Sequence, residues 1–289
     1  MPFLKKKMYR IENFLNAPIY RGIVDSEIPK PAEYRCFPGA WYYKALSSRD
    51  YWLGFDGIVR LPEFIPDEKR YVDEADYRKY LDTPSVYVGG SSDFENDIGF
   101  GWLRGIINGK ISQEKITYRP FWRYIYRDGH KIKNIYTGTK IEETEYYFFP
   151  GDEVRITVAA LKEHFLVMRI DLVKATEIEH YRLIRSRLNQ TPETLLSGLI
   201  PAPGTLIRRA EYKRVNAIDQ YGNEGKPAQM TNARTAESVW RDVYLYRRFR
   251  GGLIRVPFTE ERYIKMLCPR PEAIKVITEE SRETVVIEP

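Results

Sequence analysis

Three predicted strands, FWRYIYRD, VWRDVYLYR and DYWLGFDGIV, each combine aromatic rings with a carboxylate on one face. Successive side chains of a strand point to opposite faces, so every second residue shares a surface. The side chains that this alternation selects for a common ligand-binding face are Trp52, Asp56, Trp122, Tyr124, Tyr126, Trp240 and Tyr244. Flat rings stack on a sugar or an extended peptide, and carboxylates accept its hydroxyl or amide hydrogens. Gly54 would leave open sheet floor for the ligand. The alternative is that the rings fill an ordinary core.

The stretch SSDFENDIGFGW places Asp93, Glu95 and Asp97 at alternate positions, which puts three carboxylates on one face of a strand. Such a group could hold Ca²⁺, or a pair could serve acid–base chemistry in glycoside cleavage. The alternative is a solvated turn, because glycine and serine precede the acids. Gly99 and Gly101 then indicate either close backbone approach or a crowded strand.

A polar loop of about 18 residues is predicted between the strand-like segment Arg214–Ile218 and the strand of Trp240. It holds Asp219, Gln220, Asn223 and Glu224, whose acids and amides could line one end of a ligand groove. An ordinary glycine-containing connection is the alternative.

Signals for metal and nucleotide chemistry are weak in this sequence. The three histidines, His130, His164 and His180, show no ligand spacing, and neither cysteine belongs to a CxxC pair. No GxSxG, GxxxxGK[ST], GxGxxG or HExxH motif occurs. No cofactor is therefore predicted, apart from Ca²⁺ at the three acids. The two cysteines, Cys36 and Cys268, form no framework of the kind that small secreted domains use, and are predicted to be free and buried.

The composition is that of a β-rich soluble protein. Of 289 residues 14% are aromatic, including 22 Tyr, 13 Phe and 5 Trp, types that favour strands. The net charge of +6 comes from 46 basic and 40 acidic side chains that are interleaved along the chain, which argues against a nucleic-acid partner. No apolar run suited to a membrane span or a signal peptide is present, so no membrane partner is predicted. The sequence as written predicts a cytoplasmic protein, or a secreted one if a leader has been removed.

Short strands bounded by Gly, Pro and Asp recur along the chain. In FFPGDEVRITVAAL a turn at residues 150–152 leads into an alternating strand, and FLVMRIDLV returns, which predicts a hairpin. VDEADYRKYL predicts a short helix with acids first and bases last, whereas ATEIEHYRLIRSRL fits a helix or a strand. Many strands and few helices predict an all-β fold, a two-sheet antiparallel β-sandwich or jelly roll with one or two short helices. Residues 1–35 would form an N-terminal extension, and 36–289 a single domain.

The run WLGFDG at 52–57 resembles the Trp-x-Gly-x-Asp-Gly strand of the glutamic peptidases, or eqolisins, which are exported enzymes with a concanavalin A-like β-sandwich. FFPGDEVRITV is similar to their Pro-Gly-Asp turn, and AEYKRV to their late Ala-Glu-Trp strand. That family acts with a Gln and a Glu on its concave sheet. The resemblance places Glu211 where the Glu would be, but IVRLPEFIP, where the Gln is expected, contains none. It therefore implies the fold without the complete catalytic pair, since an amide partner would be needed to stabilise an oxyanion.

The patterns together predict a non-catalytic, lectin-like sandwich that binds a glycan or another extended polymer on an aromatic sheet face. One alternative is a hydrolase: a peptidase would use Glu211 with Asp56 as a supporting acid, and a glycosidase would use two of the three acids at 93–97. A structural or interaction protein is the other alternative. The sequence does not specify the oligomeric state.

Overall fold

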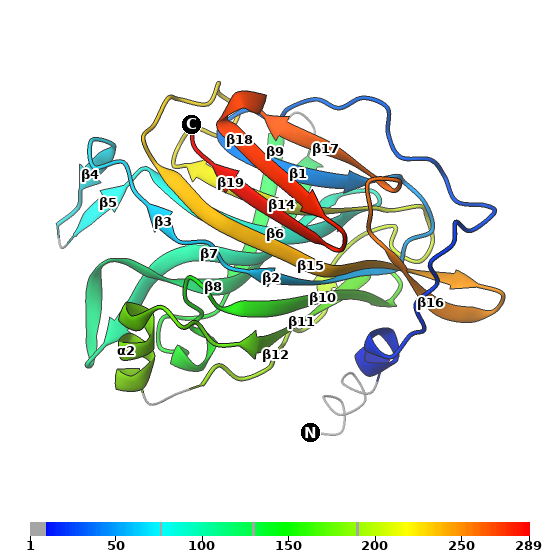
Figure 1. Ribbon diagram of the computed structural model, residues 1–289, viewed down its shortest axis with the longest axis horizontal. Coiled ribbons are helices and arrows are strands. Elements are labelled where there is room, and N and C mark those ends of the chain that lie inside the picture. Colours follow the sequence, from blue (N-terminus) through cyan, green and yellow to red (C-terminus); the bar gives the residue numbers. More distant parts are fainter. Residues whose placement is uncertain (1–9, 76, 129–130, 189–190) are drawn as a thin grey trace.

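Two large antiparallel sheets pack face to face in the computed structural model, which describes residues 10–75, 77–128, 131–188 and 191–289. Figure 1 shows the two layers with few helices around them, so the predicted all-β sandwich is confirmed. A separate two-stranded sheet stands beside them. No helix in the described ranges is long and apolar enough to cross a membrane.

The first sheet has seven strands and carries the candidate site. All its neighbouring strands are antiparallel. In order across the sheet they are β17 (Tyr263–Cys268), β1 (Ala40–Ser47), β14 (Glu211–Gln220), β6 (Asp82–Ser91), β7 (Glu95–Ile107), β8 (Lys110–Asp128) and β9 (Lys131–Gly138).

The second sheet has ten strands. Its main path runs through β12 (Leu195–Leu196), β11 (Phe165–Lys174), β10 (Glu153–Lys162), β2 (Gly54–Arg60), β15 (Arg234–Phe249), β19 (Arg282–Ile287) and β18 (Ile274–Glu279). Three short strands join this path: β13 (Ile200–Pro201) on β11, and β16 (Gly252–Pro257) and β3 (Phe64–Ile65) on β15. Strands β10 and β11 form the predicted hairpin, with Ile156 opposite Ile170.

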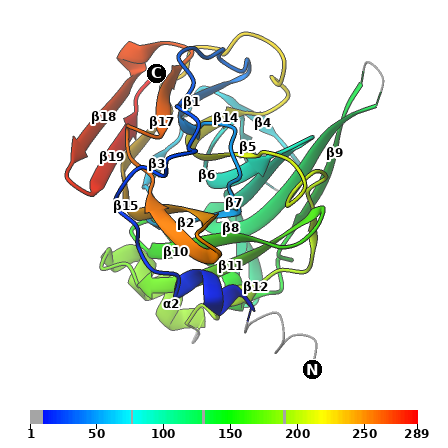
Figure 2. The ribbon, with the colours of Figure 1, turned by 90° about the vertical axis from the view of Figure 1, so that its right-hand side faces the viewer.

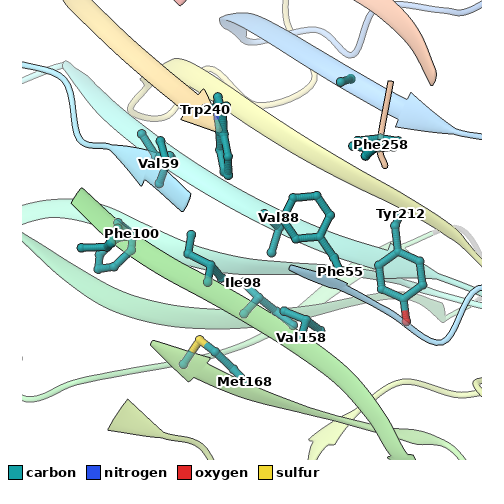
Figure 3. Close-up of a cluster of buried hydrophobic side chains, with 14 of the residues drawn as sticks. Phe55, Val59, Val88, Ile98, Phe100, Val158, Met168, Tyr212, Trp240 and Phe258 are labelled. Carbon is teal, nitrogen blue, oxygen red and sulfur yellow. The ribbon is translucent and has the colours of Figure 1, made fainter. Parts of the chain in front are cut away.

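The main hydrophobic core lies between the two sheets, as Figure 3 shows. Phe55 of β2 and Trp240 of β15 meet edge to face, with ring centroids 6.2 Å apart. The Trp240 indole donates a hydrogen bond to Asn216 Oδ1 on β14 at 2.7 Å. This contact satisfies the one polar atom of the ring and ties the two sheets together.

Besides the helical residues 10–15, the described helical segments are α2 (Glu179–Leu188) and the 3₁₀ turns η1 (Thr144–Tyr146) and η2 (Pro271–Ala273). The sequence left α2 open between helix and strand. It is a helix that buries Ile184 in a small cluster with Phe149, and its basic side chains Arg185 and Arg187 lie in the last turn, where they suit the helix dipole.

The helix predicted for VDEADYRKYL is wrong, because the segment forms the hairpin of β4 (Tyr71–Asp73) and β5 (Arg78–Tyr80). Tyr71 is opposite Tyr80, and the Arg78 guanidinium lies 4.1 Å from the centre of the Tyr71 ring. The acid-first, base-last order therefore serves cross-strand contacts, which a single-helix pattern cannot distinguish.

The N-terminal segment packs on the outer face of the ten-stranded sheet. Residues 10–15 are helical, and Ile11, Phe14 and Ala17 form a buried cluster with Tyr246 of β15. Figure 2 shows this segment against β11 and β12. Whether the domain boundary falls at residue 35 stays a prediction.

The prediction that Cys36 and Cys268 are free is wrong. They form a disulfide with a Cα–Cα distance of 5.6 Å and a sequence separation of 232. Because β17 pairs with β1, with Cys268 opposite Tyr42, the end of β17 lies beside the chain that enters β1. Two thiols that are distant in sequence thereby come within bonding reach.

Candidate functional site: a groove on the seven-stranded sheet

A groove of about 750 Å³ lies on the face of the seven-stranded sheet that points away from the core. The same strands supply both surfaces by alternation: Tyr42 lines the groove and Tyr43 the core, and Asp97 lines the groove and Ile98 the core. The aromatic side chains that contribute to the groove are Phe37, Tyr42, Tyr87, Phe94, Trp102, Phe121, Tyr126 and Tyr136.

Two glycines of β7 shape the sheet floor in different ways. A Cβ on Gly99 would lie 2.4 Å from the Val86 carbonyl oxygen, so close backbone approach requires glycine there. A Cβ on Gly101 would meet only Phe121, at 3.7 Å, so this glycine leaves space above the sheet. The close backbone approach that the sequence suggested therefore applies at Gly99, whereas neither suggested meaning, close approach or a crowded strand, applies at Gly101.

A buried ionic cluster forms part of the groove floor. The Lys213 side chain on β14 is only 7% exposed and pairs with Glu95 and, at 2.5 Å, with Asp97 of β7. Arg123 of β8 also pairs with Asp97, at 2.5 Å. Burial by itself would raise the pKa of Asp97, but the charges of Lys213 and Arg123 outweigh it and hold that pKa below its usual value.

The three predicted acids are thus held by basic side chains. Glu95 and Asp97 share a face, as predicted, and both contact Lys213. Asp93 lies in the turn before β7 and pairs with Arg208 at 2.8 Å. Within the described ranges no cluster of three or more His, Cys, Asp or Glu side chains could hold a metal ion.

Asp219 of β14 and Lys115 of β8 also line the groove, but neither forms an ion pair with a described residue. Burial raises the pKa of Asp219, and the Ser85 hydroxyl and the Arg123 charge only partly oppose it. Burial, together with the charge of Lys79, lowers the pKa of Lys115 to about 8, although Asp219 acts in the opposite direction. The charge of Asp219 therefore acts on the pKa of Lys115. The two groups form no ion pair, because the Lys115 nitrogen and the Asp219 oxygens are more than 4.0 Å apart.

Lys115 also connects the groove with a second, smaller cavity of about 180 Å³. Thr83, Trp102 and Lys115 line both cavities, and His180 and Tyr181 of α2 close the smaller one. The side chain of Lys115 is thus accessible from two sides of the sheet edge.

Glu211 lies on the same face of β14 as Lys213 and Asp219, two residues before Lys213. Burial raises its pKa, opposed by the charges of Arg49 and Lys44, yet it forms no ion pair with a described residue. Asp56, its predicted supporting acid, lies on the other sheet, fully buried beside Thr157 and Arg155. The predicted pairing of Glu211 with Asp56 is wrong, because the two carboxyls belong to different layers.

The predicted aromatic binding face is not assembled either. Trp52 is 2% exposed in the inter-sheet core and donates its indole hydrogen to the Ser48 carbonyl at 3.1 Å. Trp240 is in the same core. A Cβ on Gly54 would lie 2.2 Å from the Val158 carbonyl oxygen, so this glycine permits tight strand packing rather than an open floor.

A β-bulge in β15 explains why Trp240 and Tyr244 separate. The register with β2 shifts between Arg241 and Tyr244, and Asp242 adopts a positive φ of 51°. One extra residue reverses the facing of those that follow, so Tyr244 lies opposite Asp56, under the Arg255 guanidinium. Strict alternation could not anticipate this.

Of the three predicted residues on β8, only Tyr126 lines the groove. Trp122 is half-buried against the inter-sheet core. Tyr124 and Tyr126 stack on each other, with centroids 5.2 Å apart, and Phe94 meets both rings edge to face. They form an aromatic cluster at one end of the groove.

Sequence reasoning found one end of the groove and the acids of its floor, Glu95 and Asp97, but missed the basic side chains of the floor. Asp219, Gln220 and Glu224 line the groove, but Asp219 and Gln220, predicted to lie in a loop, are the last residues of β14. Lys213 and Lys115 were missed. The signal for the first lies in AEYKRVNAIDQ, where Glu211, Lys213 and Asp219 alternate with core residues.

Comparisons with known proteins give only a distant structural similarity. No family model and no curated protein sequence matches the chain. Among solved structures, scytalido-glutamic peptidase with a peptide-based transition state analog has a TM-score of 0.47 at 8% identity, covering 85% of this chain and 97% of that one. SCP-B, a member of the eqolisin family of peptidases, in complex with the tripeptide Ala-Ile-His, has a TM-score of 0.41 at 8% identity with the same coverage. The sandwich assignment rests on the strand pairing described above.

Proposed function

We propose that this protein binds an extended glycan, without catalysis, in the groove of the seven-stranded sheet. The observation that carries the proposal is the pair of Phe121 and Tyr136, whose rings stack at 5.5 Å with planes 16° apart. Tyr136 is 55% exposed, so it offers a flat apolar surface at the groove wall. Fixed hydrogen-bonding groups such as Arg123 and Asp97 lie on the same floor. Ring faces beside fixed polar groups are what a sugar chain requires.

Titration calorimetry against a panel of oligosaccharides tests this function. Tyr136→Ala should weaken binding about tenfold, the equivalent of about 1.4 kcal/mol of stacking. Tyr51→Ala is the matched control, because Tyr51 is 57% exposed and lies outside the groove lining. Absence of binding to every glycan, or equal affinity in both variants, would reject the proposal.

A hydrolase is the second candidate, favoured by two carboxyls on one face of β14, Glu211 and Asp219, that have raised pKa values and no ion-pair partner in the described ranges. A protonated carboxyl can act as a general acid. Incubation with denatured protein at acid pH and with β-glucans at neutral pH tests for turnover. Turnover that survives in Glu211→Gln, Asp97→Asn and Asp219→Asn would exclude these assignments.

We further propose that the protein works in an oxidising compartment, because disulfides persist there and are rare in the cytosol. The support is the Cys36–Cys268 bond. Alkylation of the protein in its source cells, followed by mass analysis, should find both cysteines protected, and modification of both without added reductant would contradict the proposal.

A further inference from the structure

Two oppositely charged groups that form no ion pair with a described residue face the groove at its Asp219 end. Asp219 on β14 and Lys115 on β8 both line the cavity, and each is half-buried. Elsewhere on the floor, the cations Lys213 and Arg123 are paired with the anions Asp97 and Glu95. Removing a charge from water is costly unless a counter-charge replaces the lost hydration. The fold offsets this cost only in part at these two positions, because Ser85 and Arg123 act on Asp219 and Asp219 acts on Lys115 without an ion pair.

A second mixed couple lies further along the same face. Glu211, at the start of β14, has Lys44 of β1 as a neighbouring charge, and neither forms an ion pair with a residue in the described part of the chain. Eight residues separate Glu211 from Asp219, a length of about 27 Å on an extended strand. Unpaired acids thus occur at both ends of the strand that crosses the groove, each with a lysine nearby.

A neutral sugar chain would leave these groups uncompensated. A purely anionic chain would satisfy Lys115 and be repelled by Asp219, and a purely cationic chain would do the reverse. Only a ligand that carries both signs on neighbouring units complements the couple. The carboxylate of Asp219 would accept hydrogens from an ammonium group, and the ammonium of Lys115 would donate to a carboxylate.

We propose that the groove selects a zwitterionic glycan, one that alternates amino sugars and uronic acids, and that Asp219 and Lys115 are the residues that determine this specificity. This inference rests on the proposed function. It names the class of glycan for the same groove.

The test compares four hexasaccharides by titration calorimetry at low salt. De-N-acetylated heparosan carries both charges, N-acetylated heparosan only carboxylates, chitosan only amines, and cellohexaose none. The zwitterionic probe should bind wild type at least tenfold more tightly than the other three. Asp219→Asn should remove the preference for the free amine, and Lys115→Met the preference for the carboxylate, each with about a tenfold loss.

Matched controls are Asp73→Asn and Lys275→Met, which remove exposed charges outside the groove and should bind as wild type does. Thermal unfolding of each variant verifies the fold, and the conservative Lys115→Arg should retain most of the carboxylate preference. Equal binding of all four probes, or unchanged selectivity in both groove variants, overturns the inference and leaves glycan binding intact. Binding of none of the probes, with binding of an alternating Lys-Glu peptide instead, overturns both.

Discussion

Strand β14 carries charge on both of its faces, and the two faces compensate that charge differently. On the core face, Arg214 is 2% exposed and pairs at 2.5 Å with Glu283 of β19, with the Trp240 ring within 5.5 Å. On the groove face, Lys213 is paired, but Asp219 and Glu211 form no ion pair within the described part of the chain.

The difference follows from what each face can reach. The core face meets the second sheet, which supplies a fixed counter-charge. The groove face meets solvent, where hydration and counter-ions rather than a fixed side chain compensate the charge.

The largest expected effect comes from breaking the core pair. Glu283→Gln keeps the side-chain size but leaves Arg214 buried without an anion, which should lower the free energy of unfolding by about 3–5 kcal/mol. Urea denaturation measures it. Glu279→Gln, on the neighbouring strand β18 and exposed, is the control and should stay within about 0.5 kcal/mol of wild type. Similar midpoints for the two variants would show that the core pair is not what stabilises this face.

Removing a carboxylate from the groove face should raise the free energy of unfolding instead of lowering it. Asp219→Asn removes an unpaired, half-buried charge, so the unfolding free energy should rise by up to about 1 kcal/mol. The same urea experiment measures it. A clear loss of stability would mean that Asp219 has a structural partner, and the contrast between the two faces would then be lost.

The free energy of unfolding should depend on pH in opposite ways through Glu283 and through Asp219. Burial would raise the pKa of Glu283, but Arg214 and its hydrogen bonds hold it below the usual value, so its stabilising contribution is present above the unfolded pKa and is lost as pH falls through the folded one. The pKa of Asp219 is raised, mainly by burial, so the folded state takes up its proton first and gains stability as pH falls. The stability gap between wild type and Asp219→Asn should therefore narrow from pH 7 towards pH 4. If urea titrations gave the same difference in stability between the two proteins at every pH, the pKa of Asp219 would not be raised in the folded state.

The smallest effect concerns reactivity rather than stability. Burial and Lys79 lower the pKa of Lys115 to about 8, so at pH 8 about half of its amine is neutral, against under about 1% for an ordinary lysine. Limiting acetic anhydride should therefore acetylate Lys115 at least about tenfold faster than exposed Lys275. Peptide mapping by mass spectrometry gives both rates. Equal rates would mean that Lys115 is protonated like a surface lysine.

The sequence predicted the architecture because strand signals are local. The β10–β11 hairpin follows from a turn at 150–152 and alternation on either side, and both features lie within one segment. The acids at 95 and 97 share a face for the same reason.

The site was harder to predict because it depends on pairing between distant segments. The Asp242 bulge reverses the facing of the end of β15, and Trp52 is buried in the core although it lies before the start of β2, where strand alternation does not apply. Lys213 reaches Asp97 across β6, because the residue of β6 opposite Lys213 is Gly89, which has no side chain in the way. The sequence of a single strand shows which side chains share a face. Which of the two faces lies in the core and which lines the groove depends on the neighbouring strands.

The bond between Cys36 and Cys268 gives the chain the topology of a covalent ring that encloses nearly the whole sandwich, groove included. A single proteolytic cut in the loop after β14 would open this ring without releasing a fragment, so the protein should migrate as one species on a non-reducing gel and as two after reduction. The same ring prevents the chain from passing as a single extended strand through a narrow pore. The disulfide would therefore have to be reduced before a protease or a translocation machine could thread this protein from one end.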